Sequence, residues 1–318
     1  MHIVTGGAGF IGSNLVHALN RRGIRDIVIV DDLEQGDKHL NLNSLAFSDF
    51  VDVRKADQLR QKLGHARVDA VLHQGACSDT TENNGRFMME TNFESSKAWF
   101  EFAAGRCPFL YASSAATYGN GANGFREEPA CEWPLNVYGF SKLAFDNFVR
   151  ARLGSVATTV VGLRYFNVYG PQENHKGRMA SLVFKLQQQA ARGEDLTVFE
   201  GSKEFLRDFV FVDDVVEVNL FFLGQSKARG IFNCGSGRAE SFDQLARATA
   251  VHFKGAKVKE IAFPADLRGK YQAFTRADLS ALRKAGYERE FTSLEAGVRS
   301  YVEVLNTTGG YLRGPHSA

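Results

Sequence analysis

The sequence predicts an α/β protein built on a doubly wound parallel sheet, with a second, smaller α/β unit interleaved with it. Apolar, strand-like runs alternate with helical patterns through the first half of the chain, and a glycine-rich turn separates the first run from the first helix. Such alternation is typical of parallel sheets that carry helices on both faces. After Gly170 the segments become shorter and more polar, which indicates the second unit.

In the first half, the predicted strands are short apolar runs that end in small or polar residues. In chain order they are 2–6, 26–32, about 50–54, 69–76, 108–114 and 158–170. The predicted helices between them are about 10–22, 56–63, 85–104 and 135–153. The run 69–76 is almost wholly apolar, as expected for a strand that is covered on both faces.

In the second half, a polar stretch precedes a helix that ends near residue 192. Residues 195–202 and 205–215 resemble two extended segments around a polar turn, and 231–237 resembles a strand with a glycine exit. Ser241 is a good N-cap for the helical pattern that follows it. No internal repeat or low-complexity stretch is present.

Length and composition place the chain among globular proteins. It has 318 residues, of which 44% are hydrophobic and 23% charged, and its formal net charge is +2. This balance favours neither a nucleic-acid nor a membrane partner. No apolar run reaches the roughly 18 residues of a membrane span, and a strand-like run starts at once, so we expect a cytoplasmic protein. The four cysteines are widely spaced, which makes disulfides and a metal site unexpected.

The glycine-rich turn predicts a Rossmann-type dinucleotide site. Gly6, Gly9 and Gly12 follow the first predicted strand and open the first predicted helix. Glycine allows a sharp turn and the close approach of a pyrophosphate, which the helix N-terminus attracts. Asp31 and Asp32 end the second predicted strand, where an acid binds an adenosine ribose. An ordinary βα unit, whose glycines serve packing alone, is the alternative.

Tyr138 and Lys142 form the candidate catalytic pair. Four residues apart on a predicted helix, they share one face. The phenol is a weak base because its ordinary pKa is about 10, and a neighbouring ammonium should lower that pKa. The ammonium could also bond the nicotinamide ribose, so that the phenol takes a proton while the nicotinamide takes a hydride. The alternative is a solvated helix face.

Ser113 and Ser114 end the predicted strand 108–114. Catalytic residues of open α/β sheets gather at the carboxyl ends of strands, and a serine there can hydrogen-bond the reacting hydroxyl. We favour Ser114, which lies closer to the AATYG loop. A cap or a turn residue is the alternative.

Several motifs resemble known families. TGGAGFIG, LYASSAATYG, NVYGFSK and RYFNVYGP resemble the extended short-chain dehydrogenase/reductase superfamily. GACSDTTE, ENHKGRMAS, FEGS followed by RDFV, and GKYQAFTRADL are similar to segments that distinguish the family of ADP-L-glycero-D-manno-heptose 6-epimerases. The similarity extends from residue 1 to about residue 305, and the second group of motifs is much the more specific.

The resemblance implies an epimerase that inverts C6 of ADP-D-glycero-β-D-manno-heptose, a lipopolysaccharide core precursor, to give ADP-L-glycero-β-D-manno-heptose. Bound NADP⁺ would oxidise the C6 alcohol to a ketone, the substrate would present its other face, and the same hydride would return. The resemblance further implies one tightly bound NADP per subunit and a homo-oligomer, suggested as a pentamer.

The resemblance also assigns a second acid/base role to Lys176. Hydride leaves and returns on one nicotinamide face, whereas the C6 oxygen points in opposite directions in the two epimers. One fixed acid/base therefore cannot serve both. Lys176 lies just past the predicted strand end that holds Asn167, and its amine would need a pKa lowered by desolvation or by neighbouring cations. A solvated loop lysine is the alternative.

The family pattern implies many further contacts. For the cofactor these are Gly6, Gly9, Phe10, Ile11, Gly12, Asp31, Asp32, Lys38, Gln74, Gly75, Ala76, Cys77, Ser78, Asn92, Lys142, Val168 and Lys176. For the substrate they are Ser114, Asn167, Arg178, Lys185, Phe199, Glu200, Gly201, Ser202, Arg207 and Tyr271. Arg207 would suit a diphosphate through its forked donors, with an ion pair to Asp208 or Asp214 as the alternative.

Two observations disagree on the choice between NAD and NADP. The two acids at the end of the second strand favour a free 2′-hydroxyl, as in NAD. Lys38, with Arg54 or Lys55, could neutralise a 2′-phosphate, although Val53 stands where family members carry a basic residue. The residues alone favour NAD and the resemblance favours NADP, which we adopt as the prediction.

The predicted units follow from these assignments. Residues 1–166, with about 210–237 and 272–287, would form the NADP-binding Rossmann domain. Residues 167–209, with about 238–271 and 288–318, would form the substrate-binding domain. Two other functions stay open.

One is a UDP-hexose 4-epimerase or another nucleotide-sugar oxidoreductase, for which Lys176 should be dispensable. A 4,6-dehydratase is disfavoured because the SSAA segment lacks its acidic pair. The other is a non-catalytic NADP-binding regulator, which would need neither Tyr138 nor Lys142.

Overall fold

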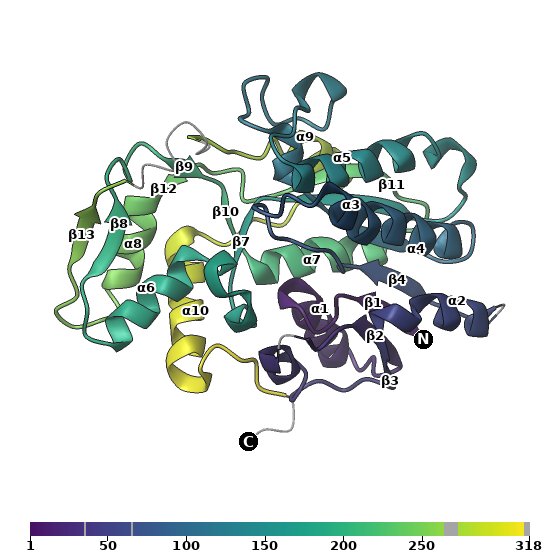
Figure 1. Ribbon diagram of the computed structural model, residues 1–318, viewed down its shortest axis with the longest axis horizontal. Helices are drawn as coiled ribbons and strands as arrows, with labels where there is room; N and C mark the ends of the chain where they lie inside the picture. Colours follow the sequence, from purple (N-terminus) through teal and green to yellow (C-terminus); the bar gives the residue numbers. More distant parts are fainter. Residues whose placement is uncertain (35, 65, 264–272, 315–318) are drawn as a thin grey trace.

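The computed structural model describes residues 1–34, 36–64, 66–263 and 273–314 (Figure 1). Its centre is a seven-stranded sheet with the order β11-β6-β5-β4-β1-β2-β3, in which all neighbouring strands are parallel. The strands are β1 His2–Thr5, β2 Ile27–Asp31, β3 Asp49–Asp52, β4 Ala70–His73, β5 Phe109–Ser114, β6 Val160–Tyr165 and β11 Arg229–Cys234. The predicted parallel sheet is therefore confirmed.

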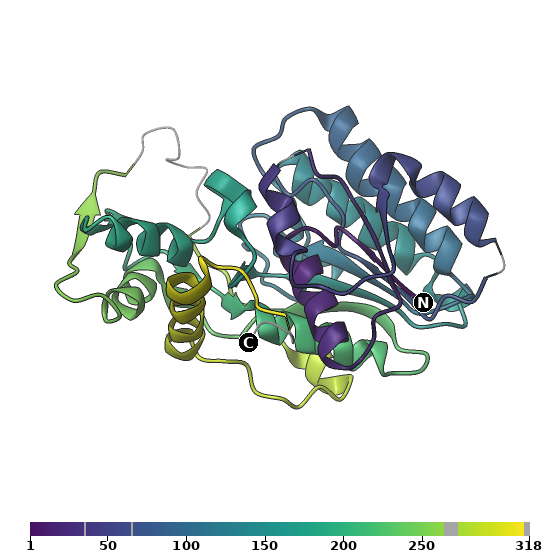
Figure 2. The ribbon, with the colours of Figure 1, turned by 90° about the horizontal axis from the view of Figure 1, so that it is seen from below.

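Helices cover both faces of this sheet (Figure 2). One face packs against α1 (Phe10–Arg21), α7 (Val212–Leu223) and α9 (Ser280–Lys284). The other face packs against α2 (Ala56–Leu63), α4 (Ser95–Ala103) and α5 (Val137–Arg150). Successive strand residues alternate between the two cores, since Ile3 lies in one and Val4 in the other, as the two-residue period of a strand requires.

The helix predicted over 85–104 is interrupted. It begins as α3 (Gly85–Met88), continues as the π-helix η3 (Met89–Glu94) and ends as α4. The wider turn of a π-helix changes which residues face inward, and such turns are frequent at functional sites. Here Asn92 lies within it and is fully buried.

The strand predicted over 158–170 is two strands. After β6 the chain leaves the central sheet at Phe166, and β7 (Asn167–Tyr169) pairs in parallel with β10 (Phe209–Phe211) instead. The extended segment predicted over 205–215 is also shorter, because α7 begins at Val212. Two acidic residues in the first turn of α7 favour a helix start there.

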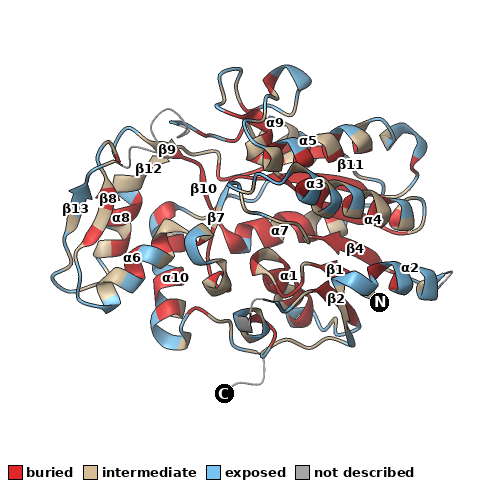
Figure 3. Cartoon of the chain, viewed as in Figure 1, coloured by how far each residue is buried: buried red, intermediate tan, exposed pale blue. Residues whose placement is uncertain are grey.

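The smaller unit surrounds a third apolar core (Figure 3). Its helices are α6 (Leu182–Ala191), α8 (Phe242–Ala250) and α10 (Leu294–Thr308), and its strands include β8 (Leu196–Phe199), β9 (Leu206–Arg207), β12 (Glu240–Ser241) and β13 (Val258–Ile261). Strand β13 pairs in parallel with β8, and β12 pairs antiparallel with β9. Ser241 forms a full capping box with Gln244, which confirms it as an N-cap.

Short 3-10 turns connect these elements: η1 Gly36–Asn41, η2 Val53–Lys55, η4 Ala115–Tyr118, η5 Pro129–Cys131, η6 Leu153–Ser155 and η7 Asn174–Met179. The exact division into two domains stays a prediction, and the pairing of β7 with β10 crosses the predicted boundary. Within the described ranges, no helix combines the length and the apolar character that crossing a membrane requires.

Candidate functional site

The glycine turn between β1 and α1 is closely packed. Gly6 has a φ of 66°, and a Cβ there would lie 2.6 Å from the backbone nitrogen of Gly75. A Cβ at Gly12 would overlap the carbonyl oxygen of Gly6. Gly9 stands at the N-cap of α1, and Phe10 is the first helical residue. Only glycine fits at positions 6 and 12. The turn therefore has the close-packed backbone that a dinucleotide pyrophosphate requires.

Asp31 and Asp32 lie beside this turn at the end of β2. The Asp31 carboxylate accepts hydrogen bonds from Ala8 N at 2.7 Å and Asp32 N at 2.8 Å, and it is only 6% exposed. Lys38 Nζ lies 2.5 Å from Asp31 Oδ1 and 3.3 Å from Asp32 Oδ1. Asp31 therefore holds the turn in place, and the more exposed Asp32 is the better placed acid for a ribose hydroxyl.

The segment after β4, predicted to contact the cofactor from Gln74 to Ser78, is fixed by buried side chains. Tyr165 donates from its hydroxyl to Gln74 Oε1 at 3.0 Å. Asn92 Oδ1 accepts from Cys77 N at 2.8 Å, and Asn92 Nδ2 donates to Cys77 O at 3.0 Å. The π-helix directs Asn92 at this backbone, so Asn92 holds the segment in place through its two bonds to Cys77.

His73 was not predicted and lies at the centre of this arrangement. Its Nδ1 is 2.6 Å from Thr5 Oγ1, and its Nε2 is 2.8 Å from Ser96 Oγ. Ser96 Oγ donates to Asn92 O, and Thr5 Oγ1 accepts from Gly75 N. We therefore assign the proton of the ring to Nε2, because the Ser96 hydroxyl hydrogen is already used. Burial lowers the pKa of His73 to about 3.

Tyr138 and Ser114 meet at the end of β5, as predicted. Their side chains are hydrogen-bonded, and this bond acts to lower the pKa of Tyr138, whereas burial raises it, with a net rise. Lys142 is 5% exposed, and its Nζ donates to Ala112 O at 3.1 Å. Burial lowers the pKa of Lys142 to about 8. We expected Lys142 to lower the pKa of Tyr138. In the protein without a ligand this expectation is wrong, because the effect of burial on the Tyr138 pKa is the largest and raises it.

Asp146, one helical turn after Lys142, anchors α5 to the sheet. Its carboxylate accepts from Tyr111 Oη at 3.0 Å and from Ser113 Oγ at 2.9 Å, both on β5. It also accepts from Arg164 Nε of β6 at 2.9 Å. Asp146 and Arg164 are both fully buried. The helix that carries the candidate catalytic pair is thus bonded directly to the strand that carries Ser114.

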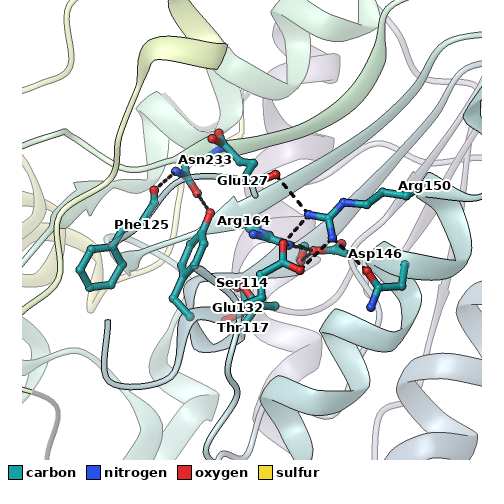
Figure 4. Close-up of polar contacts among 12 residues, drawn as sticks. Ser114, Thr117, Phe125, Glu127, Glu132, Asp146, Arg150, Arg164 and Asn233 are labelled. Carbon is teal, nitrogen blue, oxygen red and sulfur yellow. Dashed lines mark hydrogen bonds and ion pairs between the residues drawn. The ribbon is translucent and has the colours of Figure 1, made fainter. Parts of the chain in front are cut away.

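The buried ion pair continues outward (Figure 4). Arg164 pairs with Glu132 at 2.5 Å, and Glu132 also pairs with Arg150 of α5. The Arg164 guanidinium lies 4.8 Å from the ring centroid of Tyr118, whose hydroxyl donates to Asn233 Oδ1 at 2.6 Å. These contacts join η4, β6, α5 and β11, and no local sequence pattern signals them.

Lys176 lies on η7, and its Nζ is 5.0 Å from the ring centroid of Phe10 at the start of α1. Burial lowers the pKa of Lys176, the nearby Lys185 lowers it further, and Glu173 opposes them. The direction of this shift is the one that the acid/base role of Lys176 would need. The fold thus brings the Lys176 amine to the glycine turn, 166 residues away in the sequence.

Two residues predicted to bind the substrate, Asn167 and Arg207, lie on β7 and β9. Asn167 is exposed at the start of β7, and Val168 is half-buried behind it. Arg207 is 5% exposed at the end of β9, and its guanidinium lies 5.6 Å from the ring centroid of Phe242. The adjacent Asp208 accepts from the backbone N–H groups of the loop after β11, and burial raises the pKa of Asp208 to about 6.

Arg178 bridges two loops at the edge of the site. Its guanidinium donates to Asp79 Oδ2 at 2.7 Å and to Thr81 Oγ1 at 2.5 Å. Lys185 Nζ donates to Arg178 O at 2.8 Å. Both predicted substrate-binding side chains therefore gather beside η7. Tyr271, the last of the predicted set, lies outside the described residues.

The predicted substrate loop directly follows β8. Phe199 ends the strand, and its ring centroid is 5.6 Å from that of Phe263. Glu200 is exposed, Gly201 has a φ of 83°, and Ser202 is buried. Among the residues that the structure describes, no cluster of His, Cys, Asp or Glu could hold a metal ion.

Comparisons with known proteins show the family. Residues 2–235 match the NAD dependent epimerase/dehydratase family. An ADP-L-glycero-D-manno-heptose-6-epimerase from Brachyspira hyodysenteriae is 52% identical over 317 residues, which cover 98% of this chain and all of that protein.

Solved structures extend the comparison. The Helicobacter pylori ADP-L-glycero-D-manno-heptose-6-epimerase has a TM-score of 0.82 at 29% identity, with 96% of each chain covered. A Thermus thermophilus UDP-glucose 4-epimerase complex with NAD has a TM-score of 0.78 at 26% identity, with 97% of this chain and all of that one covered. The chain therefore belongs to the NAD dependent epimerase/dehydratase family and, within it, to the ADP-L-glycero-D-manno-heptose-6-epimerases.

Proposed function

We propose that this chain inverts C6 of ADP-D-glycero-β-D-manno-heptose by oxidising it to a ketone and reducing the ketone from its other face. One observation supports this above the others. The Tyr138–Ser114 pair lies at the end of β5, and the Lys176 amine lies beside Phe10 of the glycine turn, so two candidate proton carriers are held by different elements. The 52% identical relative, named for this epimerase activity, supports the same substrate.

Tyr138 is proposed as the first acid/base. Its hydroxyl shares a hydrogen bond with Ser114, which can hold the C6 hydroxyl oxygen and pass charge toward the phenol. Because burial raises the pKa of Tyr138 in the protein alone, a bound cationic nicotinamide is needed beside it to favour the phenolate. When bound, that group accepts the C6 hydride and returns it. Lys142, held by Ala112 O, is proposed to bond its ribose.

Lys176 is proposed as the second acid/base, serving the epimer whose C6 oxygen points away from Tyr138. Burial lowers the pKa of Lys176, so its ammonium gives up a proton more readily than that of an ordinary lysine. Arg207 and Arg178 are proposed to bind the ADP diphosphate, which would leave the heptose free to turn over while its anchor stays in place. The other predicted contacts of both ligands stay predictions.

Replacing Lys176 with methionine tests this role, because methionine keeps most of the aliphatic stem and loses the amine. We expect turnover of ADP-D-glycero-β-D-manno-heptose to fall about 10²–10⁴-fold, the usual contribution of a general acid/base. Epimerisation is followed by NMR in heavy water without added cofactor, and no solvent deuterium should enter at C6. Lys259→Met, at an exposed ion pair with Asp195, is the matched control.

Two outcomes would contradict the proposal. If Lys176→Met kept wild-type turnover, the two-base scheme would be abandoned. If the wild-type protein instead interconverted UDP-glucose and UDP-galactose and left the ADP-heptose untouched, the 4-epimerase alternative would replace the proposal.

For the cofactor, the family description supports a nicotinamide dinucleotide, and we propose NADP. Lys38 pairs with both acids that end β2. Arg54 pairs with Asp52 at 2.7 Å and Val53 is uncharged and 44% exposed, so we propose Lys38 as the main cation for a 2′-phosphate.

Lys38→Met should therefore weaken NADP more than NAD, by about tenfold for the loss of one charge-assisted hydrogen bond. Equilibrium dialysis of both cofactors against the wild type and the variant measures the ratio. Equal weakening of the two, or a wild-type preference for NAD, would reject NADP. Lys62→Met, at an exposed position of α2, is the control.

We further propose that the cofactor stays bound through turnover, since the reaction is redox-neutral. We also propose that the protein is a cytoplasmic homo-oligomer, and the family resemblance suggests a pentamer. Cofactor retained after gel filtration tests the first point, and the mass from sedimentation equilibrium tests the oligomeric state.

A further inference from the structure

A buried amide joins the glycine turn to the segment that precedes Lys176. Asn41, the last residue of η1, is fully buried. Its Nδ2 donates to Ala8 O in the glycine turn at 2.9 Å and to Gln172 O at 3.0 Å. The same nitrogen lies 3.3 Å from His175 Nδ1, next to Lys176. One side chain thus contacts both the predicted pyrophosphate turn and both ends of the 172–175 segment.

Gln172 has an unusual backbone conformation at this junction. Its φ is 77°, in the left-handed region that non-glycine residues rarely adopt, and it is fully buried. Such a conformation is strained and persists only where its surroundings determine it. Here Gln172 N donates to Gly310 O at 2.8 Å, and Gln172 Nε2 donates to Asn41 O at 3.0 Å. The Asn41–Gln172 contacts are therefore reciprocal.

A second amide repeats the connection from α1. Asn14 Nδ2 donates to Phe10 O at 2.9 Å and to Pro171 O at 3.0 Å. Phe10 is also the residue whose ring lies under the Lys176 amine. The start of α1 and the Lys176 segment therefore have little freedom to move apart, although the two are far separated in sequence.

We propose that Asn41, together with Gln172, is a positioning residue for Lys176, fixing the Lys176 segment on the glycine turn so that both move as one body. This inference rests on the proposed function of Lys176 as an acid/base. Its consequence is that the backbone that binds the pyrophosphate also sets where the second proton carrier stands.

Asn41→Leu tests the proposal, because leucine has nearly the same size and lacks the amide donors. The readout is competitive acetylation of lysines by acetic anhydride across a pH series, with labelled peptides quantified by mass spectrometry. If the segment is released into solvent, the apparent pKa of Lys176 should rise by about one unit. Its charged neighbours, Glu173 and Lys185, are unchanged in the variant, and Lys142 is an internal reference that should not shift.

Asn20→Leu is the matched control. Its Nδ2 also spans two carbonyl oxygens, those of Ile24 at 2.9 Å and Ala46 at 2.8 Å, and the residue is 6% exposed. It should lower stability in a similar way and leave the Lys176 labelling curve unchanged. An unchanged Lys176 pKa in Asn41→Leu, or an equal shift in Asn20→Leu, would overturn the proposal.

Gln172→Gly provides a second variant if Asn41→Leu does not fold. Glycine accepts the positive φ without strain, and the backbone bond from Gln172 N to Gly310 O can stay while the side chain and its bonds to Asn41 O and Leu312 N are lost. The same rise of the Lys176 pKa is expected, and its absence would count against the proposal equally.

A double variant shows whether Asn41 acts through Lys176. Asn41→Leu alone should lower kcat about 10²-fold, as for a small misplacement of a catalytic group, with little change in KM. Added to Lys176→Met, it should cause no further loss, and an additive loss would overturn the proposal. If Lys176→Met alone is fully active, the proposed function fails, but the labelling experiment still decides whether Asn41 positions the lysine.

Discussion

A Tyr138→Phe variant is expected to lose about 10²–10⁴-fold in kcat, the range for a general acid/base. The phenol ring stays, so the packing of α5 against the sheet should be kept, and only the oxygen that shares a proton with Ser114 is removed. Initial rates of ADP-heptose epimerisation at saturating substrate measure the loss. Circular dichroism and the amount of cofactor that copurifies establish that the variant is folded and loaded.

Tyr287→Phe is the matched control for this variant. Tyr287 is 4% exposed, and within the described residues its hydroxyl has no hydrogen-bond partner. Removing that oxygen should leave the rate unchanged and should not lower stability. A Tyr138→Phe variant within threefold of the wild-type rate would exclude Tyr138 as the first acid/base.

The largest expected effect on stability follows from Asp146→Asn. The change keeps the side-chain shape but removes one of the two carboxylates, Asp146 and Glu132, that compensate fully buried Arg164. Breaking a buried pair by removing one partner typically costs about 3–5 kcal/mol. The amide also presents a donor where the carboxylate accepts from both Tyr111 and Ser113. Urea unfolding should therefore show a lower free energy of unfolding by that amount.

An exposed ion pair provides the comparison. Arg192 and Glu194 bond at 2.8 Å on the surface, and both are more than half exposed. Arg192→Gln should change the free energy of unfolding little, because exposed pairs are screened by water and salt. If Asp146→Asn were as mild as Arg192→Gln, the buried pair would not be the anchor of α5 that we describe.

The sequence allowed the parts of the fold that depend on local spacing to be predicted. Gly6, Gly9 and Gly12 are separated by fixed short intervals, and the turn that they form depends on residues close in the chain. Tyr138 and Lys142 are one helical turn apart, and Ser114 ends an apolar strand. These features survive in the structure because short-range geometry determines them.

Other features depend on contacts that no local pattern contains. Asn41 meets Gln172 across 131 positions, and nothing near either residue indicates the other. The π-helix that turns Asn92 inward has hydrogen bonds between residues five apart, where an α-helix has them between residues four apart. This difference is too small to change the apolar pattern of the sequence. The predicted direction of the Tyr138 pKa shift was wrong for a related reason. It is a balance between burial and nearby charge, and burial is known only from the fold.

His73, at the end of β4, makes the free energy of unfolding depend on pH in acid solution. The Thr5 hydroxyl donates to the unprotonated Nδ1 of the uncharged ring, and burial lowers the pKa of His73 to about 3 in the folded chain, against 6.5 in its ordinary state. Between pH 3 and pH 6.5, His73 is protonated in the unfolded chain and stays uncharged in the native chain. Stability is thus complete above pH 6.5 and should decline by about 1.4 kcal/mol for each further pH unit toward 3. The unfolding midpoint followed from pH 7 to pH 4 would reveal this decline, and a His73→Gln variant should show a shallower one.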